Sequence, residues 1–149
     1  MQNNIVLIPI YNDWNSLNIL LKKIIDFKIF KKKTTIIIVN DFSKEKIRIK
    51  KFLFNKILNI KIINLKKNIG SQRCIAVGLS YIQRNYLNSN VIIMDGDGED
   101  NPLLIKKLLN FSREKQNKIY YDGSRTILVR RWYSGDTVRS ICFCENKST

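Results

Sequence analysis

Histidine is absent from the 149 residues of this chain, and cysteine, glycine and proline are scarce, at three, six and two residues. Without an imidazole, the chain contains no Ser-His-Asp triad, no Cys-His dyad and no His-ligated zinc site. The odd number and the spacing of Cys74, Cys142 and Cys144 argue against a disulfide framework or a metal site, so we expect a reducing compartment. The 44% hydrophobic content excludes a disordered chain.

Acidic residues are also few, with 12 Asp and Glu against 27 Lys and Arg, which gives a formal charge of +15. A nucleic-acid surface would concentrate basic residues on one face, whereas lysines occur here in nearly every segment. We therefore interpret them as solvated lysines and expect no nucleic-acid partner. No apolar run approaches the roughly 18–20 residues of a membrane span, and the polar N-terminus does not resemble a signal peptide.

From residue 4 to about 122, short β-branched runs alternate with longer stretches of helical period. The β-branched runs predict strands over 5–8, 36–39, 60–65, 91–94 and 119–121. The periodic stretches predict four helices. The first runs from the cap residue Asp13 to about Phe27, and the second runs from the cap residue Ser43 to Phe52. The third has its apolar face over 75–86, and the fourth begins at Asn101-Pro102. The apolar face of the first helix consists of Leu17, Leu20, Leu21, Ile24 and Ile25. This alternation predicts an α/β fold with a mostly parallel sheet and helices on both faces.

Residues 4–125 are predicted to form one domain. From residue 126 the composition changes: lysine nearly disappears, Cys142 and Cys144 occur together, and the alternation of strands and helices stops. We interpret 126–149 as an atypical tail, either disordered or not native to the domain.

Acidic side chains gather where the predicted strands end, and this is the edge at which ligands bind to open parallel sheets. The segment 95–100 contains four acids within six residues. Crowded like charges cost free energy unless a cation neutralises them, and oxygen donors without His or Cys suit Mg²⁺ or Mn²⁺. Taken alone, such a segment is equally typical of an exposed acidic turn before a helix.

Five segments together resemble, in the same order, the motifs of family 2 glycosyltransferases with the GT-A fold. They are Pro9-Ile10-Tyr11-Asn12-Asp13, Val39-Asn40-Asp41-Phe42-Ser43, Asn68-Ile69-Gly70-Ser71-Gln72 with Gly78-Leu79, the run from Ile93 to Pro102, and Tyr121-Asp122-Gly123-Ser124-Arg125. The branch that they resemble most is the dolichyl- and polyprenyl-phosphate sugar transferases. Residues 4–125 would then be the N-terminal, nucleotide-sugar-binding half of such a domain, and we expect the chain to be truncated at its C-terminus.

The resemblance implies roles for eight residues. Asp95 and Asp97, as the Asp-x-Asp motif, would be catalytic and would hold Mg²⁺ or Mn²⁺. Tyr11 would lie near the base, and Asp41 would hydrogen-bond the base edge. The residues expected to contact the nucleotide sugar are Pro9, Tyr11, Asp13, Asp41, Gly96 and Glu99.

Two departures from the family pattern occur in the second motif. Asn40 stands in place of an Asp, and Phe42 stands in place of a Gly. Phenylalanine does not readily take the backbone angles that glycine takes, so we expect this loop to be altered.

The function implied by the resemblance is transfer of a sugar from a nucleoside-diphosphate sugar to an acceptor, with help from a divalent metal. The implied acceptor is a polyprenyl phosphate, and we expect the chain itself in the cytoplasm, peripheral at the inner face of the membrane. Two alternatives remain: a truncated, non-catalytic nucleotide-binding module, or a receiver-like α/β signalling domain. A receiver has its acids after the first and third strands, whereas the acids here follow the second and fourth.

Overall fold

A mostly parallel sheet forms the centre of the structure. The computed structural model describes residues 3–26, 34–50, 58–86, 89–98, 102–103 and 129–131. Within these segments, one sheet with the order β3-β2-β1-β4-β5 is formed by β1 (Asn3–Ile10), β2 (Thr34–Asn40), β3 (Leu58–Asn64), β4 (Ser89–Ile93) and β5 (Val129–Arg131). Strands β1 to β4 are parallel, and β5 pairs antiparallel with β4. The strands predicted over 5–8, 36–39, 60–65 and 91–94 are confirmed.

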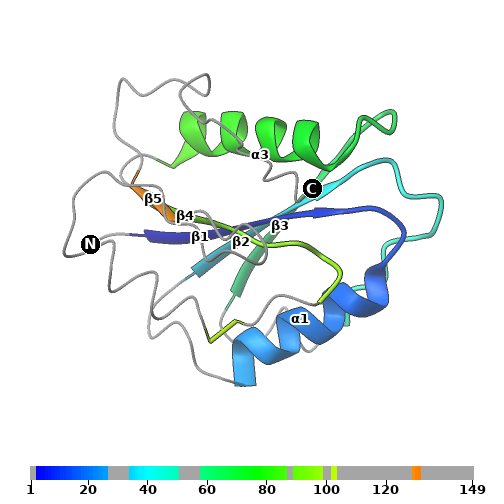
Figure 1. The fold of residues 1–149 in the computed structure, drawn as a ribbon, viewed down its shortest axis with the longest axis horizontal. Coiled ribbons are helices and arrows are strands. Elements are labelled where there is room, and N and C mark those ends of the chain that lie inside the picture. Colours follow the sequence, from blue (N-terminus) through cyan, green and yellow to red (C-terminus); the bar gives the residue numbers. More distant parts are fainter. Residues whose placement is uncertain are drawn as a thin grey trace, which may run out of the picture.

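Helix α1 (Trp14–Asp26) covers one face of the sheet and α3 (Ser71–Asn85) covers the other (Figure 1). Side chains alternate along the strands, so Val6 and Ile8 of β1 pack in the cluster with α1, whereas Ile5 and Leu7 pack in the cluster with α3. All four are fully buried. Because both faces are covered, the central strands contain unbroken apolar runs, over 5–10 in β1 and 36–39 in β2. The predicted α/β fold with helices on both faces is confirmed.

Both helices bury the faces that the sequence predicts. Asp13 caps α1, since Ser16 N donates a hydrogen bond to Asp13 Oδ1 at 3.1 Å. The residues of the two predicted faces that are buried are Leu17, Leu20, Leu21, Ile24, Ile75, Leu79 and Ile82. No helix in the described segments is long and apolar enough to cross a bilayer.

The helix predicted from Ser43 to Phe52 is wrong over the residues that the structure describes, because 41–50 contain no helix. The reason lies on α1. The buried Asn18 side chain donates from Nδ2 to the Arg48 carbonyl at 2.7 Å and accepts at Oδ1 from Lys50 N at 3.0 Å. The amide group thus bonds to alternate residues of an extended segment, as a neighbouring strand would. Local periodicity carries no information about a partner so distant in the sequence.

Two further predictions lie mostly outside the described residues. The strand at 119–121 lies wholly outside them, and the helix from Asn101 is described only at 102–103, which form a turn. Strand β5, in contrast, is an element that the sequence patterns do not predict. It lies in the segment 126–149 and pairs Arg130 with Val91. A short antiparallel edge strand breaks the alternation from which the other strands are predicted.

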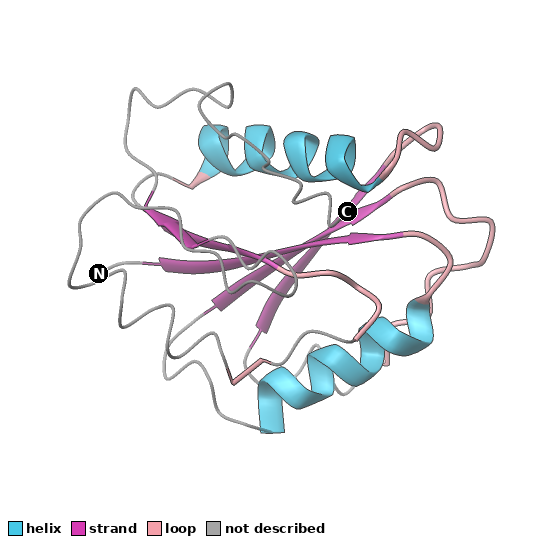
Figure 2. Cartoon of the chain, viewed as in Figure 1, coloured by secondary structure: helices cyan, strands magenta, loops and turns pink. Residues whose placement is uncertain are grey.

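The loops that follow β1, β2, β3 and β4 gather at one edge of the sheet (Figure 2). Hydrogen bonds between neighbouring segments continue past the strand ends: Asp41 N donates to Ile10 O at 2.9 Å, and Leu65 N donates to Asn40 O at 3.0 Å. The residues directly after the strands are therefore held in register with one another.

Helix α3 approaches the sheet closely at Gly78. A β-carbon added there would collide with Leu7 Cδ1 and would lie 3.1 Å from Val39 Cγ2. Leu7 and Val39 are fully buried, so neither side chain has open space to move into. The missing side chain is thus what lets α3 pack against β1 and β2.

We predict that Gly78→Ala lowers the free energy of unfolding by about 1–3 kcal/mol through overpacking, although alanine is the better helix former. Urea unfolding followed by circular dichroism measures this change. Arg84→Ala, at an exposed position of the same helix, is the control and is expected to stay within about 0.5 kcal/mol of the wild type. A Gly78→Ala protein as stable as the wild type would show that α3 shifts away from the sheet without cost.

Candidate functional site

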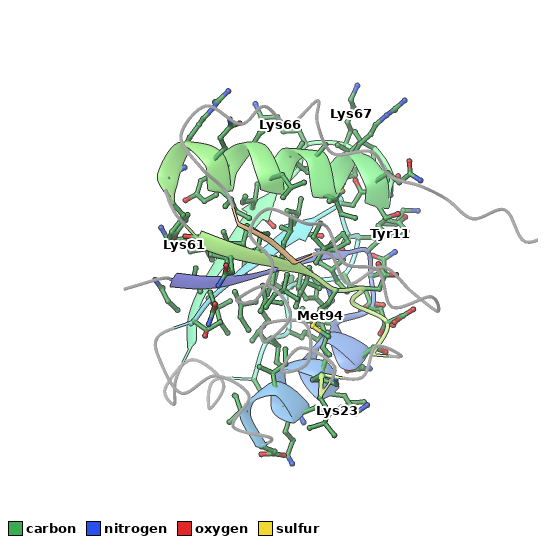
Figure 3. All side chains as sticks on the ribbon, turned by 60° about the vertical axis from the view of Figure 1, so that its left-hand side comes forward. Tyr11, Lys23, Lys61, Lys66, Lys67 and Met94 are labelled. Atoms are coloured by element: carbon green, nitrogen blue, oxygen red, sulfur yellow. The ribbon has the colours of Figure 1, made fainter. Side chains whose placement is uncertain are left out.

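A hollow of about 290 Å³ opens at the edge where the strand-end loops gather. Its lining comes from the ends of β1, β2 and β4 and from the first residue of α3: Pro9, Ile10, Tyr11, Asp13, Asp41, Ser71, Asp95, Gly96 and Asp97. Figure 3 shows Tyr11 just past the end of β1. Residues far apart in the sequence thus meet around one space.

Seven of the eight residues predicted from the sequence line this hollow, and Glu99 lies outside the described residues. How each of the seven contacts a ligand stays a prediction. Ile10 and Ser71 also line the hollow, although sequence reasoning assigned them no role. Both lie inside the motifs that carry the family resemblance, and that position is the signal that could have found them.

Four of the lining residues, Asp13, Asp41, Asp95 and Asp97, carry carboxylates, and none of the lining residues in the described segments is basic. Asp41 is buried, Asp95 is half-buried, and Asp13 and Asp97 are exposed. Within the described segments, no group of three His, Cys, Asp or Glu side chains is placed to hold a metal ion. Proteins commonly bind Mg²⁺ through one or two carboxylates together with waters and substrate phosphates. Asp95 and Asp97 supply oxygen donors of the kind that suits Mg²⁺ or Mn²⁺, and whether they bind a metal stays a prediction.

The absence of a side chain at Gly96 allows the segment 95–97 to lie close to β1. Gly96 is buried, and a β-carbon added there would lie 2.9 Å from the backbone oxygen of Pro9. Because that oxygen cannot rotate away, glycine is the residue that allows this approach. Further along the loop, Lys23 Nζ of α1 donates to Gly98 O at 3.4 Å. The two aspartates thus sit on a loop that is fixed on both sides.

Asp41 braces the loop between β3 and α3. It is 3% exposed, and its carboxylate accepts two backbone hydrogen bonds, from Ile69 N to Oδ1 at 2.7 Å and from Gly70 N to Oδ2 at 2.9 Å. Each carboxylate oxygen can accept a further hydrogen bond, so the predicted contact with a base is compatible with this brace. The sequence motif does not reveal that Asp41 holds this loop, because Ile69 and Gly70, which donate the hydrogen bonds, belong to another loop.

Asn12 joins the loops that follow β1 and β2. Asn12 N donates to Ser43 Oγ at 2.9 Å, and Lys44 N donates to Asn12 Oδ1 at 2.8 Å. Ser43 therefore binds the neighbouring loop, and its predicted role as a helix cap is wrong. Sequence reasoning assigned Asn12 no role, although it lies within the first motif.

Phe42 adopts a left-handed backbone with φ of 58°. The expectation that phenylalanine alters this loop by avoiding glycine-like angles is therefore wrong. The neighbouring residues fix the conformation, since Asp41 N donates to Ile10 O and Ser43 N donates to Asn40 Oδ1 at 3.0 Å. A residue with a β-carbon pays about 1–2 kcal/mol for this backbone, so the loop is strained.

The sequence profile of glycosyl transferase family 2 matches residues 5–138. The chain belongs to this family. An uncharacterised glycosyltransferase of Synechocystis sp. is 34% identical over 118 residues, which are 77% of this chain and 36% of that protein. The family 2 chain thus spans about a third of the length of this curated relative. The match runs beyond residue 125, and the domain boundary there stays a prediction.

Solved structures of TarS from S. aureus share the fold of this family 2 chain. Residues 1–349 of TarS in complex with UDP-GlcNAc match with a TM-score of 0.57 and 20% identity, over 84% of this chain and 36% of that one. The TarS complex with UDP gives a TM-score of 0.55 at 20% identity, over 84% of this chain and 37% of that one. This likeness confirms the GT-A fold. Membership of family 2 does not support the receiver-like alternative.

Cys74 lies in the first turn of α3 and is fully buried. Burial, and then the hydrogen bond and negative charge of Asp41, raise the pKa of its thiol from 9.0 to about 12. The thiol therefore stays protonated at neutral pH, and a protonated, buried thiol is a poor nucleophile.

We predict that iodoacetamide at pH 8 leaves Cys74 unlabelled in the folded protein and labels it in urea, as read by peptide mass spectrometry.

The raised pKa of the Cys74 thiol also makes the stability of the protein depend on pH. Because the unfolded thiol ionises near 9.0 and the folded one near 12, this group's contribution to stability is present below pH 9 and is lost as the pH rises toward 12. Cys74→Ala should remove this part of the decline, and an unchanged decline in that variant would contradict the assignment.

Proposed function

We propose that this chain is the nucleotide-sugar-binding part of a glycosyltransferase that moves a sugar from a nucleoside-diphosphate donor to an acceptor. Family membership supports the reaction class, and the hollow lined by strand-end carboxylates supports the location of the donor. The solved TarS structures include complexes with UDP-GlcNAc and with UDP, which supports a uridine nucleotide as the first donor to test. The chain spans about a third of its curated relative, so turnover by this chain is part of the proposal.

In this proposal, Asp95 and Asp97 hold Mg²⁺ or Mn²⁺ beside the diphosphate of the donor. The cation would supply Lewis-acid stabilisation of the charge that develops on the departing nucleoside diphosphate. The protein's task is to present both carboxylates in a fixed position before the donor arrives, since preorganised charges need no rearrangement during the reaction. The close packing of Gly96 against β1 supports this task.

A polyprenyl phosphate is the acceptor that we propose, because the motifs resemble that branch of the family. Such an acceptor is already an anion, so its attack on the sugar needs no general base. A chain with a formal charge of +15 is attracted to anionic membrane surfaces, which supports a place at the inner face of the membrane. Lys66 and Lys67 are exposed on the loop that follows β3 (Figure 3).

We predict that the wild type binds UDP in a Mn²⁺-dependent manner, and that Asp95→Asn and Asp97→Asn each weaken this binding about tenfold or more, because each loses a charged ligand of the cation. Isothermal titration calorimetry with and without Mn²⁺ measures both effects. Asp26→Asn is the matched control: it removes the same charge from an exposed ion pair with Lys22 on α1 and should leave UDP binding unchanged.

Three outcomes separate the proposals. Absence of Mn²⁺-dependent binding for UDP, GDP and CDP alike would refute the donor site. Binding accompanied by transfer of a radiolabelled sugar to polyprenyl phosphate in vesicles would support the whole reaction. Binding without transfer would instead identify the chain as a non-catalytic nucleotide-binding module.

A further inference from the structure

Phe42 combines two features that seldom occur together. Its backbone lies in the left-handed region, with φ of 58°, and its side chain is 52% exposed. An exposed apolar residue by itself is ordinary. A strained backbone that carries a large exposed ring is different, because strain of this kind tends to persist where it serves a function. Core packing does not account for the ring, since half of it faces solvent.

The backbone at this position does not require phenylalanine. In the neighbouring loop, Asn12 has nearly the same φ, 59°, and asparagine is a residue type that adopts this conformation readily. The two loops continue the pairing of β1 with β2: Ile10 pairs with Asn40, and beyond the strand ends Asn12 N donates to Ser43 Oγ. A small polar residue would therefore satisfy the turn, and the ring needs another explanation.

The surroundings of Phe42 indicate what the ring could contact. Phe42 itself is not one of the lining residues, but its neighbour Asp41 lines the hollow, and so does Tyr11, which precedes Asn12 and is 47% exposed. Two exposed aromatic side chains thus stand on two loops that are joined by hydrogen bonds, at the end of β1 and β2. The acidic pair Asp95 and Asp97 follows β4, on the other side of β1. An elongated ligand with one flat apolar end, and with an anionic end that carries a divalent cation, matches this arrangement.

We propose that Phe42 contacts the nucleobase of the donor and, with Tyr11, forms the aromatic part of its binding site. This inference rests on the proposed function and deepens it. Stacking on an aromatic ring is tolerant of base identity because every base has a π-face. Phe42 therefore contributes affinity for the base, whereas the buried Asp41 beside it is placed to read the base edge.

The test compares the wild type with Phe42→Gly, Phe42→Asn and Phe42→Tyr by calorimetry in Mn²⁺, using UDP and, as a base-free probe, inorganic pyrophosphate. We expect Phe42→Gly and Phe42→Asn to weaken UDP binding about 5- to 30-fold, and Phe42→Tyr to stay within about threefold of the wild type. Pyrophosphate binding should not change in any variant, because pyrophosphate has no base.

Phe42→Gly should also raise Tm by about 2–6 °C, since it relieves the left-handed strain.

Ile19→Ala is the control for loss of an exposed apolar side chain, because Ile19 is 54% exposed and lies on α1 instead of on the loops that follow β1 and β2. It should leave UDP binding unchanged. A Phe42→Gly protein that binds UDP as tightly as the wild type, or that loses UDP and pyrophosphate binding equally, would overturn the base contact. If the wild type itself binds no nucleoside diphosphate, the proposed function fails, and that result is distinct from a failure confined to the variants.

Discussion

Hydrogen bonding between neighbouring segments does not stop where the strands end, and the candidate site depends on this continuation. Asp41 N donates to Ile10 O, and the Asp41 carboxylate accepts from Ile69 N and Gly70 N. One buried residue thereby fixes the loops after β1, β2 and β3 relative to one another. A buried donor left without a partner costs about 1–3 kcal/mol, so these bonds resist local rearrangement. The hollow keeps its shape because its walls are tied to each other as well as to the sheet.

Net charge and local charge have opposite signs in this protein. The chain carries a formal charge of +15, whereas the charged residues that line the hollow within the described part of the chain are aspartates. Net charge governs encounters with anionic surfaces over distances of about a Debye length, roughly 8–10 Å in physiological salt. Binding in the hollow is governed by the nearby carboxylates, which disfavour a bare diphosphate and favour a cation. In the proposed function, a cation shared with the diphosphate would reconcile the anionic ligand with the anionic site.

The loops at this edge also contain backbone features that restrict the residue type. Left-handed conformations occur at Asn12, where they suit asparagine, and at Phe42, where they are strained, and Gly96 packs against a backbone oxygen that leaves no room for a side chain. Elsewhere the sheet and helices follow local preferences, with apolar strands and amphipathic helices. The regular core stabilises the loops that carry the strain, which is the division of labour expected when a rigid scaffold presents functional loops.

The sequence by itself determined the order and type of the central elements, because apolar runs and helical periodicity are local properties: the strands β1 to β4 and the buried faces of α1 and α3 follow from them. The family motifs also identified most of the residues that line the hollow. Local patterns failed where the partner is distant. Asn18 holds residues 48–50 extended where periodicity predicts a helix, and Asp41 and Ser43 bind other loops instead of acting only within their own. The left-handed backbone of Phe42 was decided in the same way, by hydrogen bonds of its neighbours to other strand ends, because contacts between segments far apart in sequence can outweigh the preference of a single residue.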